Sequence, residues 1–270
     1  FLAMRYAGRY DRTGSSARKR DASKIIMDVI TPDWPAPTQV RALTTTRDGG
    51  LSERFYASLN LGSHVGDNAL SVQQNREYLF KHAELPSQPF WLDQIHSIKV
   101  VENTNENCVT PIQADASFAK KKGLVCAVMT ADCLPILLCN KQGSVVAALH
   151  AGWRGLLAGV VENTINQLGE PEELLAWCGP AIGPGKFEVG IEVEKAFVEK
   201  KTIMKQAFQQ VDQSHFLADL YALARMTLLD CGVKNIFGGE YCTYNQANKF
   251  YSYRREPITG RMASLIWIQP

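Results

Sequence analysis

The stretch that decides the fold of this chain is Gly123–Cys139, GLVCAVMTADCLPILLC. Its apolar character is nearly continuous, which is typical of strands that are covered on both faces and therefore lose the alternation of polar and apolar residues. The break Thr130-Ala131-Asp132 predicts a turn between two such strands, and a turn that interrupts a core is a frequent place for function. After it, Asn140-Lys141-Gln142-Gly143 predicts a hairpin into a further strand over 144–150.

Strand and helix signals are mixed along the rest of the chain. The sequence predicts further strands at 39–46, 89–92, 98–101, 174–178, 235–237, 250–253 and 263–268. It predicts helices at 69–85, with Ser71 as the N-cap, from the 152–155 turn to about 168, at 188–200 and at 217–231. No internal repeat, dinucleotide-binding GxGxxG or P-loop interrupts this order. We expect an α/β fold with mixed β-sheets and flanking helices.

The charge of the chain is unevenly distributed. The formal net charge is +2, but the first 24 residues carry +5 and the remaining residues carry −3. We expect residues 1–26 to be a basic extension, non-native or disordered, with Met27 as the natural start; a transit-like or nucleic-acid-binding arm is the alternative. Residues 27–270 are then one catalytic domain, whose mildly acidic balance gives no sign of nucleic-acid binding.

The cysteine content favours a reducing compartment. The chain has seven cysteines, an odd number, in apolar surroundings that suit buried thiols better than disulfides. No apolar run approaches the roughly 20 residues that cross a bilayer, and the N-terminal segment lacks the apolar core of a secretory signal. We therefore expect a cytoplasmic protein without a membrane partner.

Three residues at strand ends form a candidate metal site: His96, Cys133 and His150. Two imidazoles and a thiolate without an obvious fourth ligand suit a zinc ion that keeps one position open, as catalytic zinc does. A fourth protein ligand such as His64 would instead indicate a non-catalytic zinc protein. Without metal, Cys133 could act as a nucleophile and His150 as its base.

Copper is a weaker alternative for the same residues. One cysteine and two histidines are also the ligands of a blue-copper site, with Met129 as a distant axial partner. Multicopper oxidation further needs a trinuclear cluster built from histidines, and the chain has five histidines in all. A laccase reaction is therefore disfavoured. Beside the ligands, Arg154 offers a planar fork to a phosphate or carboxylate.

At these residues the chain resembles a known family. The matching segments are Ser58–Gly62, Val65–Asn68, Asn75-Arg76, Gln94–His96, Ala114–Ala116, Thr130–Pro135, His150–Gly155, Gly179–Gly183 and Ser252–Arg255. The chain is similar to the family labelled multicopper polyphenol oxidase or laccase-like, now associated with purine nucleoside phosphorylase and adenosine deaminase activity, which includes a bacterial peptidoglycan-editing factor. The resemblance covers residues 27–270.

The resemblance implies a fold and a zinc site. The fold is an α/β sandwich with mixed sheets, related to cytotoxic necrotizing factor and its cysteine-hydrolase Cys–His pair. The implied zinc ligands are again His96, Cys133 and His150, the residues reached from ligand chemistry.

The implied reactions are phosphorolysis of adenosine, inosine, guanosine and methylthioadenosine, and deamination of adenosine. Phosphorolysis needs cations for phosphate, and deamination needs an acid or base near a metal-activated water. Expected catalytic residues are Cys133, His150, Asp132 and Arg154, and expected substrate contacts are Asn60, Arg76, Asp115, Arg254 and Arg255. We expect purine nucleosides and phosphate as partners, a peptidoglycan precursor as a further one, and a monomer or weak dimer. The alternatives are a Cys–His hydrolase acting on cell-wall precursors, a copper polyphenol oxidase and a non-catalytic zinc protein.

Overall fold

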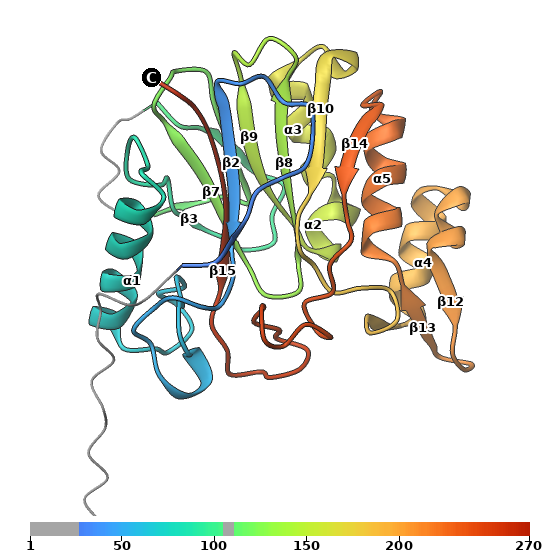
Figure 1. Ribbon diagram of the computed structural model, residues 1–270. Helices are drawn as coiled ribbons and strands as arrows, with labels where there is room; N and C mark the ends of the chain where they lie inside the picture. Colours follow the sequence, from blue (N-terminus) through green and yellow to red (C-terminus); the bar gives the residue numbers. More distant parts are fainter. Residues whose placement is uncertain (1–26, 105–110) are drawn as a thin grey trace, which may run out of the picture.

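Two β-sheets packed face to face form the centre of the computed structural model, which describes residues 27–104 and 111–270 (Figure 1). One sheet has four antiparallel strands in the order β1-β2-β15-β7, and the other has six strands of mixed direction in the order β14-β10-β8-β9-β6-β4. Helix α1 lies outside the first sheet, and helices α2 to α5 lie outside the second. The expected mixed α/β fold is confirmed.

The strands have the following bounds. Those of the two large sheets are β1 (Val29–Ile30), β2 (Val40–Thr45), β4 (Val100–Glu102), β6 (Ala116–Ala119), β7 (Val125–Thr130), β8 (Leu134–Asn140), β9 (Val146–Ala151), β10 (Leu174–Cys178), β14 (Asn235–Gly238) and β15 (Met262–Ile268). The shorter ones are β3 (Leu92–Asp93), β5 (Ile112–Gln113), β11 (Glu188–Gly190), β12 (Phe208–Gln210) and β13 (His215–Ala218).

The α-helices are α1 (Ala69–His82), α2 (Trp153–Ala158), α3 (Val160–Leu168), α4 (Ile191–Lys200) and α5 (Leu220–Asp230). Short 3-10 helices are η2 (Arg54–Tyr56), η3 (Pro171–Glu173) and η4 (Thr202–Ala207). None of the helices in the described ranges combines the length and apolar character that a bilayer crossing requires.

The alternation along β8 shows why its sequence is apolar throughout. Leu134, Ile136 and Leu138 pack into the core under the helices, whereas Leu137 and Cys139 pack into the core between the two sheets. Successive side chains of a strand point to opposite faces, so a strand in the middle of a layered fold needs apolar residues at every position. The same reasoning holds for β7, all six of whose residues are buried.

Two helix boundaries in the structure differ from the expected ones. The helix expected to run to about residue 168 is two helices, because Gly159 adopts a left-handed conformation (φ 113°) that ends α2 and begins α3. Helix α1 is capped by Asn68, whose side chain accepts from the Ser71 amide, so the expected Ser71 cap is wrong.

Other differences concern strands. Residues 188–190 pair with β13 as a strand ahead of α4, and the helix expected from 217 begins only at Leu220. The expected strand at 250–253 is irregular backbone, and of the expected 89–92 strand only Leu92 lies in a strand, β3. The predicted extension, residues 1–26, and Cys108 lie outside the described residues.

Candidate metal centre and substrate cleft

The three expected metal ligands lie at one place, where the chain passes from one sheet to the other. Cys133 lies in the turn between β7 and β8, and His150 lies near the end of β9, beside β8. His96 comes from the segment between β3 and β4. One donor atom of each residue lies within 4.8 Å of the others, so the group could hold a metal ion.

The donor set fits a first-row metal such as zinc. The Cys133 Sγ lies 3.8 Å from the His96 Nε2. Zn–S and Zn–N bonds of about 2.3 and 2.0 Å at a tetrahedral angle place two such atoms roughly 3.5 Å apart. Among the residues with described positions, no fourth histidine, cysteine or carboxylate joins the group. The structure therefore supports a metal site with three protein ligands.

Asp115 fixes the position of two of these ligands from behind. Its Oδ1 accepts from the Nδ1 of His150 at 2.8 Å and from the backbone N–H of His96 at 3.0 Å. Its Oδ2 accepts from the Ser97 hydroxyl at 2.8 Å and from the Ile95 amide at 3.2 Å. Occupation of Nδ1 leaves Nε2 of His150 free for the metal, the arrangement of a carboxylate–histidine–metal triad.

Asp115 is fully buried, so it cannot touch a substrate in the cleft. It differs here from the substrate contact expected from the sequence. Burial on its own raises the pKa of the carboxyl, but the hydrogen bonds from His150 and Ser97 outweigh burial and lower it. The carboxylate is thus ionised and acts on its neighbours as a fixed negative charge.

Gln94 anchors the same segment to strand β7. Its amide nitrogen donates to the carbonyl of Met129 at 2.8 Å, and its amide oxygen accepts from the Met129 N–H at 2.7 Å. This pair of hydrogen bonds copies the pairing of two strands, so it ties the loop of His96 to the end of β7. His96 itself has a left-handed backbone (φ 59°), which a non-glycine residue adopts only where its surroundings hold it.

The charges of Cys133 and His150 stabilise each other. Burial on its own raises the pKa of the Cys133 thiol, but the neighbouring His150 and His96 lower it to about 6. Burial likewise opposes protonation of His150, and the Cys133 thiolate together with Asp115 raises the pKa of that imidazole to about 9. In the absence of metal, the pair is a thiolate beside an imidazolium near neutral pH.

Gly152 leaves room for these ligands. A Cβ added to Gly152 would lie 2.8 Å from the Cys133 Sγ and 3.1 Å from the His96 Cδ2, so only glycine fits at that position.

Asp132 has a left-handed backbone (φ 87°) held by its own side chain. Its two oxygens accept from the Thr243 hydroxyl and the Arg254 amide, both at 2.6 Å.

A cavity of about 500 Å³ lies in front of the ligands. This is within the range of roughly 300–1,000 Å³ that is typical of small-molecule sites. Its lining is rich in cations and rings, and the residues that matter for chemistry are His64, Asp132, Trp153, Arg154, Phe187, Tyr253, Arg254 and Arg261, with the three metal ligands. Asp132 is the sole carboxylate in this lining.

The expected site residues divide into two groups. Cys133, His150, His96, Asp132, Arg154 and Arg254 line the cavity, whereas Asn60, Arg76, Asp115 and Arg255 do not. Arg76 donates to the Leu61 carbonyl and lies over the Trp91 ring, 4.3 Å from its centroid. Arg255 donates to three carbonyls, those of Thr243, Tyr244 and Phe250. Both arginines brace the backbone, which differs from the expected substrate contacts.

Asn60 also has a role other than the expected one. It is fully buried, accepts from the amides of Gly62 and Arg261, and donates to Asp67. It therefore joins the segment around residue 61 to the start of β15.

Sequence reasoning gave no role to Arg261, Tyr253 or Phe187 in the cavity lining, nor to Gln94. The signal for Arg261 lies in sheet pairing, because Met262 pairs with Thr130 and thereby brings Arg261 beside the turn of Cys133. His64, suspected as a fourth ligand, lines the cavity but is not one of the grouped metal donors.

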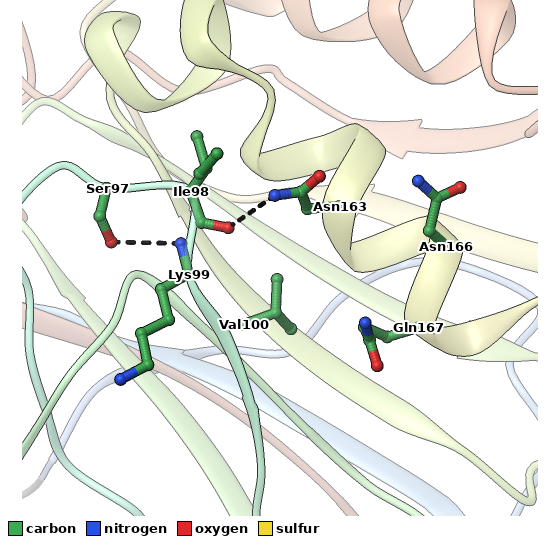
Figure 2. A pocket seen from close by; sticks show the side chains of 7 residues that line it. All are labelled: Ser97, Ile98, Lys99, Val100, Asn163, Asn166 and Gln167. Carbon is green, nitrogen blue, oxygen red and sulfur yellow. Dashed lines mark hydrogen bonds between the residues drawn. The ribbon is translucent and has the colours of Figure 1, made fainter.

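A separate groove lies beside the segment that follows His96 (Figure 2). It is bounded by Ser97–Val100 on one side and by polar residues of α3 on the other. Asn163 of α3 donates to the Ile98 carbonyl at 3.1 Å, and the Ser97 hydroxyl accepts from the Lys99 amide at 3.2 Å. These bonds brace the loop of His96 against α3, and we assign the groove no chemistry.

The histidines argue against a laccase centre. His82 stacks on Tyr78 at the end of α1, and His215 bonds Asp212 beside β12. Three of the five histidines of the chain thus line the cavity, too few for a blue-copper site and a trinuclear cluster together.

Comparisons with known proteins agree with the fold. The chain is 52% identical to the protein named purine nucleoside phosphorylase YfiH of Escherichia coli over 241 residues, which is 89% of this chain and 98% of that protein. It is 34% identical to a protein named purine nucleoside phosphorylase of Corynebacterium glutamicum, over 87% of this chain and 96% of the relative.

The crystal structure of the Neisseria meningitidis protein NMB0706 superposes with a TM-score of 0.86 at 49% identity, over 90% of this chain and 99% of that one. That of YlmD from Geobacillus stearothermophilus gives 0.81 at 27% identity, over 86% and 93%. The sequence profile of one family matches residues 41–269. This chain belongs to the multi-copper polyphenol oxidoreductase laccase family.

Proposed function

We propose that residues 27–270 form one catalytic domain of a zinc-dependent purine nucleoside phosphorylase. The observation that carries the proposal is the group His96, Cys133 and His150, which offers three ligands and leaves a metal open toward a cavity of nucleoside size. Relatives at 50–52% identity that bear this name support the choice of reaction. The cysteines of the described part are all free, three of them buried, which suits a cytoplasmic enzyme.

The cavity lining suits the two substrates of phosphorolysis. Three arginines give the lining a positive charge that suits phosphate, and the one carboxylate among its described residues, Asp132, is already occupied by two donors. Phe187, Trp153 and Tyr253 offer apolar ring faces on which a purine base can stack. Arg154 lies over the Trp153 ring and Arg254 over the Phe187 ring, so positive charge and ring faces adjoin each other in this lining. A nucleoside that stacks on a ring would then lie beside the charge that attracts phosphate.

The ligands and their neighbours would then have separate tasks. A zinc ion on His96, Cys133 and His150 would supply Lewis-acid chemistry. Asp115 would keep the proton of His150 on Nδ1, so that Nε2 stays a metal ligand. Asp132, which we expected as a free acid or base, would instead hold the Arg254 segment against the cavity wall.

The same centre would also deaminate adenosine. The three-ligand group supports this second reaction because hydrolysis also needs an open metal position. A role in peptidoglycan editing would be a consequence of the specificity of this cavity. A Cys–His hydrolase acting on cell-wall precursors is the second candidate. The observation in its favour is the lowered pKa of Cys133, about 6, beside a protonated His150.

The test is turnover of inosine and adenosine by protein of measured metal content. We expect hypoxanthine and ribose 1-phosphate from inosine only with phosphate, and inosine from adenosine without it. Metal-stripped protein should lose both reactions and regain them with zinc. No nucleoside turnover by zinc-loaded protein, with cleavage of a peptidoglycan precursor, would favour the hydrolase. Phenol oxidation by the copper-loaded protein would favour a polyphenol oxidase.

A further inference from the structure

Arg261 is a partly buried cation at the cavity whose guanidinium has no carboxylate partner among the described residues. It is partly buried at the start of β15 and lines the cavity that contains Cys133 and His150. Among residues 27–104 and 111–270, no carboxylate lies within salt-bridge distance of its guanidinium. The only hydrogen bonds of the guanidinium to described residues run from Nη1 to the carbonyls of Thr259 and Gly260, at 3.1 and 3.0 Å.

A partly buried guanidinium without a counter-charge destabilises the folded protein unless a ligand supplies the negative charge. A guanidinium has five N–H donors, and burial without a counter-charge lowers its stability in the charged form. Burial accordingly lowers the pKa of Arg261, while the charges of Cys133 and Asp132 oppose that effect. Both of these groups line the cavity, and neither forms an ion pair with Arg261.

The chain builds a specific support for this side chain. Asn60 accepts from the Arg261 amide at 2.9 Å and from the Gly62 amide at 2.9 Å, so it fixes the two segments together. The Leu61 amide donates to the Arg261 carbonyl. A Cβ on Gly62 would lie 2.8 Å from the Cγ of Arg261, so the glycine leaves the space that the arginine stem occupies.

The other arginines of the cavity are less suited to hold a small anion. Arg154 is exposed and lies over the Trp153 ring, 4.3 Å from its centroid. Arg254 is exposed, donates to the Glu188 carbonyl and lies over Phe187. Exposed cations are screened by water and salt, whereas a partly buried one keeps more of its attraction. Arg261 also lies over a ring, that of Tyr253, at 6.0 Å from its centroid, so exposure is what distinguishes it. Among the described residues it is the arginine of this lining that is not exposed.

We propose that Arg261, together with His64, is the oxyanion subsite of this cleft and binds the inorganic phosphate consumed in the reaction. His64 is exposed at the same cavity, and among its charged neighbours Arg261 lowers its pKa most. A neutral imidazole still offers one N–H to a phosphate oxygen, beside the guanidinium fork. The identity of the oxyanion as a co-substrate rests on the proposed function, whereas anion binding by Arg261 does not.

The experiment compares Arg261→Gln with Arg154→Gln, an exposed cation of the same cavity, and with Arg41→Gln, an exposed arginine of β2 outside it. In inosine phosphorolysis, Arg261→Gln should raise the KM for phosphate about 10- to 100-fold, the effect of losing a charged hydrogen-bonded contact, with the KM for inosine within about threefold. Arg154→Gln should raise the phosphate KM less than about fivefold, and Arg41→Gln should leave it unchanged. Arg261→Lys, which keeps the charge and loses the fork, should lie between.

A second measurement separates this inference from the proposed function. Titration calorimetry with inorganic phosphate alone should detect binding to the wild type and to Arg41→Gln, and about 10-fold weaker binding or none to Arg261→Gln. If the wild type turns over no nucleoside but binds phosphate through Arg261, the reaction is wrong and the subsite stands. If Arg261→Gln and Arg261→Lys bind phosphate as the wild type does, or if Arg154→Gln has the larger effect on the phosphate KM, the subsite is overturned.

Discussion

Replacing Asp115 by asparagine should weaken metal binding without removing a single metal ligand. The carboxylate accepts on both oxygens: Oδ1 from His150 and from the His96 amide, and Oδ2 from Ser97 and the Ile95 amide. An asparagine has one oxygen, so its NH₂ group must face donors on one side. Either His150 loses its orienting partner or the loop of His96 loses its anchor.

The magnitude follows from these contacts. Partners that orient a metal ligand are worth about 10- to 100-fold in metal affinity, or about 1.4–2.7 kcal/mol. The loss of two charge-assisted hydrogen bonds, at about 1.5 kcal/mol or more each, should lower the free energy of unfolding by roughly 3 kcal/mol, which is on the order of 10 °C in Tm.

The pH dependence supplies a second readout. The folded state lowers the pKa of Asp115, so its stabilisation is present above the unfolded value near 4 and is lost as the pH falls below it. The stability gap between wild type and Asp115→Asn should therefore narrow in acid.

The assay is competition of zinc with a chromophoric chelator, together with thermal unfolding of the metal-free proteins between pH 3 and 7. Asp93→Asn, a change at an exposed carboxylate on β3, is the matched control and should leave zinc affinity unchanged. Wild-type zinc affinity in Asp115→Asn, with an unchanged Tm, would refute the view that Asp115 positions the ligands.

Three further predictions concern the same site and the ends of the chain. Cys133→Ala should remain folded but lose bound metal, because it removes one of three ligands from a core that is otherwise intact; full zinc occupancy by elemental analysis would reject the ligand assignment. In metal-free protein, iodoacetamide should label Cys133 with an apparent pKa of about 6, since the thiolate forms above that value, and bound zinc should protect it; peptide mass spectrometry that finds an ordinary thiol profile would contradict the Cys133–His150 pair. A chain that begins at Met27 should keep its kcat on the best nucleoside, because residues 1–26 fall outside the family match, and a large loss in a folded protein would assign the basic extension to the site.

The group of two histidines and a cysteine that could hold a metal ion was predictable because its signals are local in the sequence. A cysteine or histidine where an apolar strand ends is visible without a structure, and the mixed α/β character follows from apolar periodicity. Asp115 was expected to contact the substrate, and the structure places it buried behind His150, which only tertiary packing shows. The break at Gly159 was missed since the apolar period continues through it.

Arg261 and Gln94 were beyond the reach of sequence reasoning for a related cause. Their roles depend on pairing between segments far apart in the chain: β15 beside β7 for Arg261, and the Gln94 side chain on Met129. A sequence pattern shows that strands exist, but it does not show which strands are neighbours.

The turn 131–133 has a consequence for how the protein resists unfolding. It is the point where the chain leaves the four-stranded sheet at Thr130 and enters the six-stranded sheet at Leu134. A metal ion bound to Cys133, His96 and His150 would cross-link this junction to two other segments of the chain. By mass action, free metal at 1,000 times its dissociation constant adds about 4 kcal/mol to the native state. The supply of metal in the cell would then set the lifetime of the folded protein as well as its activity, and metal starvation would mark the molecule for degradation.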